Sequence, residues 1–228
     1  PSTGVDELDR VLGGGIVPGA AILLTGEPGV GKSTLLLDVA SRTSRAGTRT
    51  LYISAEESIG QVRLRAERTG ALEEELFISS TTDLGEILGH VQATDPGLLI
   101  VDSVQTVAAD TIESAPGGPA QVREAAASLI RLAKERSLPV ILVGHVTKDG
   151  QVAGPALWST SSTWCASLRE TQIRLFVSCE PSRTVLAQPM KWAASKCWKT
   201  ASMRSLTPAH CSAQPTRLRL VEPAPRLH

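Results

Sequence analysis

The sequence predicts an α/β fold in which a mostly parallel sheet is flanked by helices. The first observation is the regular alternation of short apolar runs with longer amphipathic segments through residues 1–150. The second is that the runs are apolar at every position, as in Leu98–Val101, which is typical of parallel strands buried on both faces. The third is a glycine-rich turn between the first run and the first amphipathic segment, a junction that α/β folds use between strand and helix.

Each predicted element rests on its own pattern. Ala21–Thr25 is an apolar strand that ends at the glycine-rich turn, and Ser33–Ser44 follows it with apolar residues at helical spacing. Ser58–Thr69 is a charged surface helix, and the Gly- and Pro-rich stretch Ser114–Pro119 is a loop. By the same criteria the other strands are Thr50–Ser54, Leu76–Ser79, Leu98–Val101 and Val140–Val143, and the other helices are Leu84–Ala93 and Gln121–Glu135.

The glycine-rich turn carries a phosphate-binding motif. Its residues fit the pattern G-x-x-x-x-G-K-[ST] without a mismatch, with a predicted strand before it and a helix after it. Backbone N–H groups of such a loop turn towards phosphate oxygens, and the helix N-terminus favours negative charge. Lys32 should reach the β and γ phosphates of ATP, and the Ser33 hydroxyl should bind Mg²⁺. The predicted nucleotide-binding residues are Gly26, Glu27, Pro28, Gly29, Val30, Gly31, Lys32, Ser33 and Thr34.

Two further positions are predicted to complete the site. Asp102 follows the buried strand Leu98–Val101, where a carboxylate would support the magnesium ion. Glu56 and Glu57 follow the strand Thr50–Ser54 at its carboxyl end, the end at which such sheets place their ligands. We predict that Glu56 activates the attacking water. An acidic residue in this place also suits the start of the next helix, and for Glu57 this capping role fits at least as well as a catalytic role.

A third candidate catalytic residue follows the last predicted strand. His145 and Thr147 come after Val140–Val143, where they would sense the γ-phosphate of the nucleotide. A histidine in that place fits a structural role equally well.

The last third of the chain differs sharply in composition from the rest. All four Trp, all four Cys and both Met lie after residue 155, and this segment has ten basic residues against three acidic ones. Two stretches so different rarely belong to one evolved domain. We therefore predict a folded domain at residues 1–155 and a separate tail at 156–228.

The composition gives little support for a zinc-binding, secreted or membrane protein. The cysteines form no C-x-x-C pair, which argues against a zinc ribbon, and nothing suggests secretion and disulfides. The formal net charge is zero, so charge neither favours nor excludes a nucleic-acid partner. The chain begins Pro1-Ser2-Thr3, so we expect a segment of a longer protein. No apolar run approaches the roughly 18 residues of a membrane span, so we predict no membrane association and a cytoplasmic location.

Several stretches resemble a known family. Thr3–Asp9 and Gly13–Gly19 precede the phosphate-binding loop as in RecA-like P-loop ATPases. Within that family the chain is most similar to the bacterial RadA/Sms group of DNA repair ATPases. The similar stretches are Tyr52–Ser58, Asp102–Thr106, Val143–Lys148 and Val152–Pro155. The resemblance covers residues 2–155 and implies a RecA-like fold, with the residue at position 56 as the catalytic glutamate.

The resemblance also implies partners. It predicts an ATPase of DNA repair and recombination that forms a homo-oligomeric ring or filament, binds single-stranded DNA and acts on recombination intermediates by branch migration. The DNA-contacting loops would be Val104–Arg123 and Thr147–Pro155, where Arg123 and Lys148 are basic but aromatic residues are few. Two alternatives stay open: a RecA- or KaiC-like ATPase with another partner, and a non-catalytic nucleotide-binding remnant.

The tail departs from the family pattern. After Gly154-Pro155 it lacks the family's Leu-Glu-His stretch and its Lys-Asn-Arg-Phe-Gly motif. Codons for Ser182–Pro189, read one nucleotide back, can encode Lys-Asn-Arg-Phe-Gly-Pro-Thr, so we hypothesise a reading-frame shift; a genuine basic domain is the alternative. A shifted tail would be irregular or disordered and would leave an unpaired edge on the sheet. Sequencing the source DNA decides between the two.

Overall fold

The predicted α/β fold is confirmed in the computed structural model, which describes residues 2–109, 118–145, 163–169, 172–178, 184–186, 190–191 and 219–220. The elements up to residue 145 are β1 (Ala21–Gly26), β2 (Thr50–Ser54), β3 (Leu76–Ser80), β4 (Leu98–Asp102), β5 (Val140–His145), α1 (Asp6–Val11), α2 (Lys32–Arg45), α3 (Ile59–Thr69), α4 (Leu84–Thr94), the 3₁₀ helix η1 (Val104–Thr106) and α5 (Pro119–Arg136). The short helices α1 and η1 were not predicted from the sequence.

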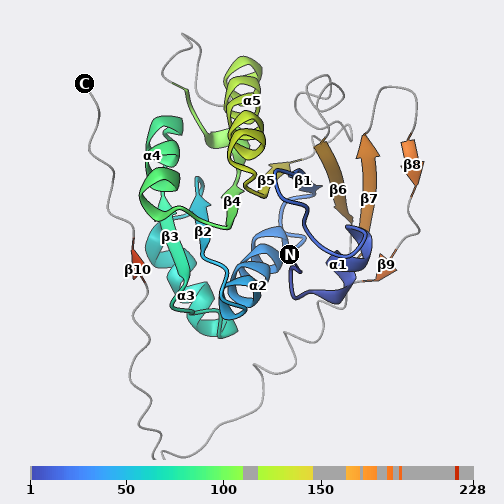
Figure 1. Cartoon of the computed structure of the whole chain (residues 1–228), viewed down its shortest axis with the longest axis horizontal. Helices are drawn as coiled ribbons and strands as arrows, with labels where there is room; N and C mark the ends of the chain where they lie inside the picture. The colour runs from blue at the N-terminus through green and yellow to red at the C-terminus, as the bar shows by residue number, and fades with distance from the viewer. Residues whose placement is uncertain are drawn as a thin grey trace, which may run out of the picture.

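The five central strands form a parallel sheet in the order β3-β2-β4-β5-β1 (Figure 1). Register places Gly26 of β1 opposite His145 of β5, and Ser54 of β2 opposite Asp102 of β4. The carboxyl ends of these strands therefore meet at one edge of the sheet. This is the edge at which open α/β sheets bind their ligands.

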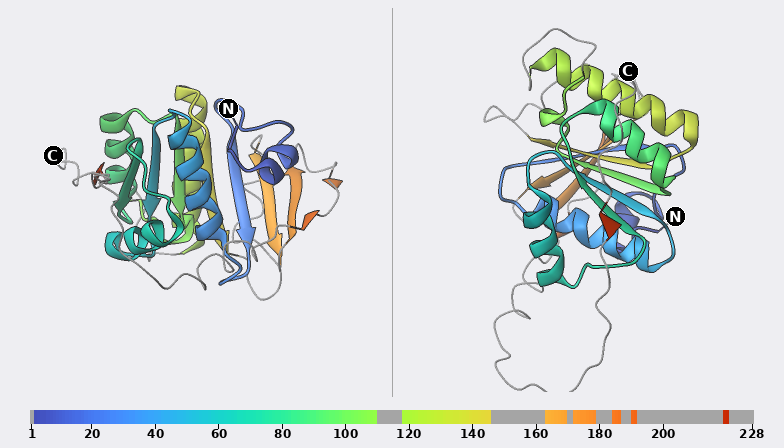
Figure 2. Two further views of the ribbon diagram at one scale, coloured as in Figure 1. Left: turned by 90° about the horizontal axis from the view of Figure 1, so that it is seen from below. Right: turned by 90° about the vertical axis from the view of Figure 1, so that its left-hand side faces the viewer.

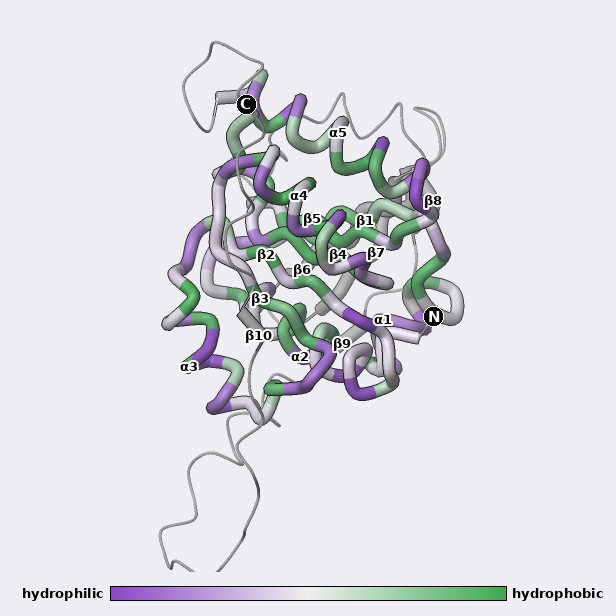
Figure 3. The backbone as a smooth tube through the Cα atoms, turned by 60° about the vertical axis from the view of Figure 1, so that its left-hand side comes forward, coloured by the Kyte–Doolittle hydropathy of each residue, from purple (hydrophilic) through white to green (hydrophobic). Residues whose placement is uncertain are grey.

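Helices cover both faces of the sheet, as the end-on view in Figure 2 shows. Helices α2 and α3 pack on one face, where Leu36 and Val62 join a hydrophobic cluster with Ile100 and Tyr52. Helices α4 and α5 pack on the other face, around residues such as Leu129. The strands β1, β2 and β4 are buried along their whole length, whereas many residues along α3 are hydrophilic (Figure 3). Burial of the strands on both faces explains why their sequences show no alternation.

Local signals fix where the helices begin. Ser58 caps α3 in a reciprocal capping box with Gln61, and the Asp83 side chain accepts hydrogen bonds from two backbone N–H groups at the start of α4. Helix α5 starts with Pro119, a residue that suits the first turn because its missing N–H has no partner there. These three helices begin within two residues of their predicted first residues.

The sheet continues beyond β1 and β3, contrary to the expectation of an unpaired edge. Strand β6 (Thr163–Arg169) pairs with β1 in parallel, and β7 (Gln172–Ser178) pairs with β6 in antiparallel fashion. The sequence of β7 is rich in β-branched and aromatic residues, with apolar residues at 173, 175, 176 and 177, which suits a strand. The other described segments of the tail are β8 (Thr184–Leu186), β9 (Met190–Lys191) and β10 (Arg219–Leu220), of which β10 pairs with β3. The predicted boundary at residue 155 lies outside the described residues.

Helix α4 contains a buried histidine, His90, from which we predict that the fold is less stable at acidic pH. His90 is 1% exposed, its Nε2 lies 3.0 Å from Ser79 Oγ, and its Nδ1 has no partner within the described residues. Burial lowers the pKa of His90 below 6.5, although Glu86 opposes the shift. As the pH falls, the histidine is therefore protonated at a higher pH in the unfolded chain than in the folded one. The free energy of unfolding should then decrease below pH 6.5, by at most about 1.4 kcal/mol per pH unit.

Urea unfolding of the full chain between pH 7.5 and 5.5 measures this effect. The variant His90→Gln should lose part of the pH dependence, because glutamine does not titrate. An identical pH dependence in the variant and the wild type would contradict the assignment to His90.

Candidate nucleotide-binding site

The phosphate-binding motif forms the turn between β1 and α2, as the sequence predicts. Gly29 and Gly31 have positive φ angles of 80° and 96°, conformations that side chains rarely adopt. Gly31 is also the N-terminal cap of α2, so its conformation directs the chain from the turn into the helix. Residues 27–29 are exposed, and α2 presents its N-terminus beside them. The turn therefore has the backbone shape that an anion-binding loop needs.

Lys32 is buried at the centre of this turn. Its side chain is 5% exposed, and Nζ donates hydrogen bonds to the carbonyl oxygens of Gly26 at 2.8 Å and Glu27 at 2.9 Å. Burial lowers the pKa of Lys32, while the negative charges of Asp102 and Glu56 act in the opposite direction. These two carboxylates are therefore close enough to interact with the ammonium group. The three residues come from the ends of three different elements and converge on one edge of the sheet.

Asp102 is held by a tyrosine that sequence analysis did not select. Tyr52 of β2 donates a hydrogen bond of 2.8 Å from its phenol to Asp102 Oδ2. The tyrosine is 1% exposed and the aspartate 8% exposed. Burial, followed by the charge of Asp102, raises the pKa of Tyr52 well above 10, so the phenol remains a donor. The signal in the sequence was an aromatic residue with a polar tip inside an apolar strand, which needs a buried partner.

Glu56 and Glu57 have different environments. Glu56 is exposed, and its Oε1 accepts a hydrogen bond from the hydroxyl of Ser103. Ser103 follows Asp102 directly, and the peptide bond between them is cis. Glu57 instead forms an ion pair with Arg65 of α3, and Ser58 rather than Glu57 caps that helix. Glu56 thus turns towards the end of β4 and Glu57 towards α3, an arrangement that favours Glu56 as the residue of the site.

Several predicted residues lie partly or wholly outside the described part of the chain. His145 ends β5 opposite Gly26, but its side chain is not among those described. Thr147 and the loop Thr147–Pro155 are outside the described residues, as is the middle of the loop Val104–Arg123. Arg123 is exposed on α5. The roles of these residues therefore stay predictions.

The donor set fits Mg²⁺ bound with a nucleotide. Within the described residues no group of three or more His, Cys, Asp or Glu side chains is placed to hold a metal ion. Mg²⁺ does not need such a cage, because it is commonly bound through one or two protein groups together with substrate phosphates and water. The half-buried Ser33 at the start of α2 and Asp102 at the end of β4 are groups of that kind.

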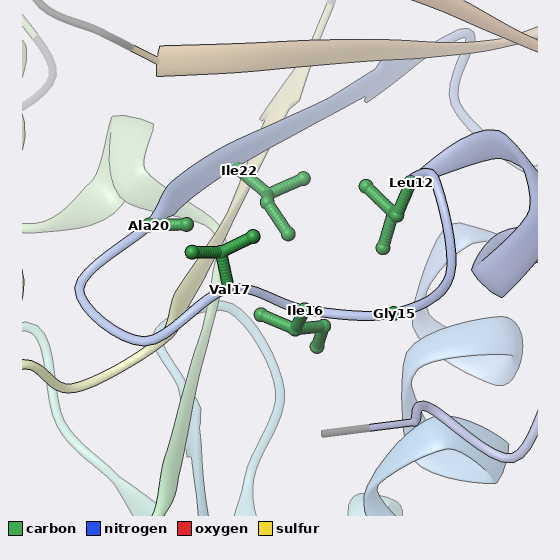
Figure 4. A pocket seen from close by; sticks show the side chains of 6 residues that line it. All are labelled: Leu12, Gly15, Ile16, Val17, Ala20 and Ile22. Atoms are coloured by element: carbon green, nitrogen blue, oxygen red, sulfur yellow. The ribbon is translucent and has the colours of Figure 1, made fainter.

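A separate apolar hollow lies at the other end of β1 (Figure 4). Its lining consists of residues without polar side chains, namely Leu12, Gly15, Ile16, Val17, Ala20 and Ile22, and it has no room for a bound molecule. It therefore plays no part in the site. No helix among the described residues is long and apolar enough to cross a membrane.

Comparison with known proteins identifies the family of the chain. A protein family described as AAA domain matches residues 4–151. The chain is 54% identical over 155 residues to the DNA repair protein RadA of Mycobacterium tuberculosis, 48% to that of Bacillus subtilis and 45% to that of Streptococcus pneumoniae. These matches cover 67% or 68% of this chain but only 32%, 34% and 37% of the relatives. The chain thus spans about a third of the length of the curated relatives it matches.

Proposed function

Because the chain belongs to the AAA domain family and resembles RadA over its matched residues, we propose that it is an Mg-ATP-dependent ATPase of DNA repair. The observation that carries the proposal is the convergence of Lys32, Asp102 and Glu56 beside a loop of the phosphate-binding type. A buried lysine that donates to two loop carbonyls and interacts electrostatically with two carboxylates supports nucleotide binding at this loop.

Each residue has a role that its position supports. Lys32 and the loop from Gly26 would bind the β and γ phosphates, and Ser33 and Asp102 would hold the magnesium ion, which neutralises phosphate charge when bound. Glu56 would accept a proton from the attacking water, because its carboxylate is exposed and oriented by Ser103. His145 is proposed as a γ-phosphate sensor from its place at the end of β5.

The proposed partners are single-stranded DNA and recombination intermediates, and the proposed assembly is a homo-oligomer. The names of the relatives mention DNA repair alone, and both proposals rest on the resemblance of the sequence to the RadA/Sms group. The arginines at positions 42, 45, 49, 63 and 65 on and around α2 and α3 are paired with acidic residues. That face is therefore poorly suited to bind DNA, and the loops near Arg123 and residues 147–155 are the better candidates.

A second candidate function is a nucleotide-binding module that does not hydrolyse ATP. The observation that favours it is the absence of the Lys-Asn-Arg-Phe-Gly motif from the tail. Basic residues of that motif would otherwise face the nucleotide or DNA.

Hydrolysis of Mg-ATP by the full chain, with and without single-stranded DNA, tests the proposal. We expect turnover that requires MgCl₂ and increases when DNA is added, together with a salt-sensitive shift of labelled single strands. A hydrolysis rate that is unchanged by DNA would support the ATPase activity and refute the DNA partner. The chain would then be a RecA- or KaiC-like ATPase with another partner. Nucleotide binding without turnover would favour the second candidate.

A further inference from the structure

The only tyrosine of the chain, Tyr52, is hydrogen-bonded to the carboxylate of Asp102, the proposed magnesium ligand. Tyr52 lies on β2 opposite Ile100 of β4, and Asp102 is two residues further along β4. Side chains two residues apart on a strand point to the same face. The phenol and the carboxylate therefore share the face that α2 covers, on which Lys32 also lies.

The environment of this pair fixes the direction of the hydrogen bond. The Tyr52 ring packs within the hydrophobic cluster beneath α2 and α3, so its hydroxyl has no access to water. Asp102 Oδ2 is the acceptor, at 2.8 Å. A buried hydroxyl without a partner is costly, and a hydrogen bond to a charged acceptor is stronger than one between neutral groups. Both effects hold the carboxylate in one orientation.

We propose that Tyr52 is a positioning residue for magnesium: its phenol binds Asp102 Oδ2 and holds the carboxylate in one orientation, in which Asp102 would bind the ion. This inference rests on the proposed function, because it assigns a role within the same site. Tyr52 is 1% exposed and its hydroxyl is bonded to Asp102, so removal of the hydroxyl should alter the response to magnesium rather than the phosphate-binding loop. Without the phenol, Asp102 would sample several orientations, and the ion would bind less tightly.

The variant Tyr52→Phe tests the role because it removes one oxygen and keeps the ring. The measurement is the binding of a fluorescent ATP analogue to the full chain as MgCl₂ is titrated. We expect the MgCl₂ concentration that gives half of the magnesium-dependent gain in affinity to rise about tenfold. Affinity in the presence of EDTA should stay close to that of the wild type.

Thr50→Val is the matched control. Thr50 is fully buried on the same strand and face, far from Asp102 along the sheet. Two acceptors, Thr43 Oγ1 and the Thr48 carbonyl oxygen, lie within hydrogen-bond distance of its single hydroxyl donor. Both variants lose one buried hydroxyl, so a general loss of stability should affect both, whereas only Tyr52→Phe should change the response to magnesium. Equal magnesium titrations for Tyr52→Phe, Thr50→Val and the wild type would overturn the inference.

A second measurement needs no substitution at the site. Because Tyr52 is the only tyrosine, the chain labelled with 3-fluorotyrosine should give a single fluorine NMR resonance. We expect that resonance to move when MgCl₂ is added to the complex with ATP. An unchanged resonance in the bound complex would overturn the role of Tyr52. A wild-type chain that binds no nucleotide at all would instead refute the proposed function, and this inference with it.

Discussion

Replacing Lys32 with alanine should lower Mg-ATP turnover by about 100-fold or more and weaken ATP binding. The ammonium group is buried, bonded to two loop carbonyls and influenced by the charges of Asp102 and Glu56. Its positive charge is placed where phosphate oxygens would approach the loop. The experiment compares hydrolysis rates and nucleotide affinities of the full-length variant and the wild type.

Lys134→Ala is the matched control for this loss of a lysine. Lys134 is exposed in the last turn of α5, on the face of the sheet opposite to α2. Its removal changes the net charge by the same amount and should leave turnover unchanged. If Lys32→Ala hydrolysed ATP as fast as Lys134→Ala does, the loop after β1 would not be the nucleotide site.

Most of the fold could be predicted because its strands are buried on both faces. A run such as Leu98–Val101 is apolar at every position, and its type and place are visible without knowledge of its neighbours. Helix α1 was not predicted because its six residues are too few to show a helical period. The edge beyond β1 was also predicted wrongly, because pairing with β6 depends on sheet order rather than on local pattern.

The site likewise combines residues that a local motif reveals with residues that only the order of the strands brings together. The loop after β1 has a contiguous motif, so its residues could be recognised directly. The hydrogen bond between Tyr52 and Asp102 could not be predicted, since it requires β2 and β4 to be neighbours although β3 lies between them in the chain. The position of Ser103 beside Glu56 depends on that same neighbour relation.

The variant Glu56→Gln should lower kcat by about 100-fold or more while ATP binding changes little. Glutamine keeps the size of the side chain and its hydrogen-bond acceptor for Ser103, but it cannot accept a proton from water. The expected pattern is therefore a chain that binds Mg-ATP and does not turn it over. Rates at saturating ATP, together with nucleotide affinities, measure the two effects separately.

Glu57→Gln provides the decisive comparison, because the two residues are adjacent and chemically identical. Glu57 pairs with Arg65 at the surface of α3, and the loss of a partly exposed ion pair costs about 1 kcal/mol or less. The variant should therefore keep its turnover. If Glu57→Gln were inactive and Glu56→Gln active, the roles of the two carboxylates would be exchanged. If both variants hydrolysed ATP normally, neither carboxylate would activate the water, and the base would have to be sought in the loops after β4 and β5.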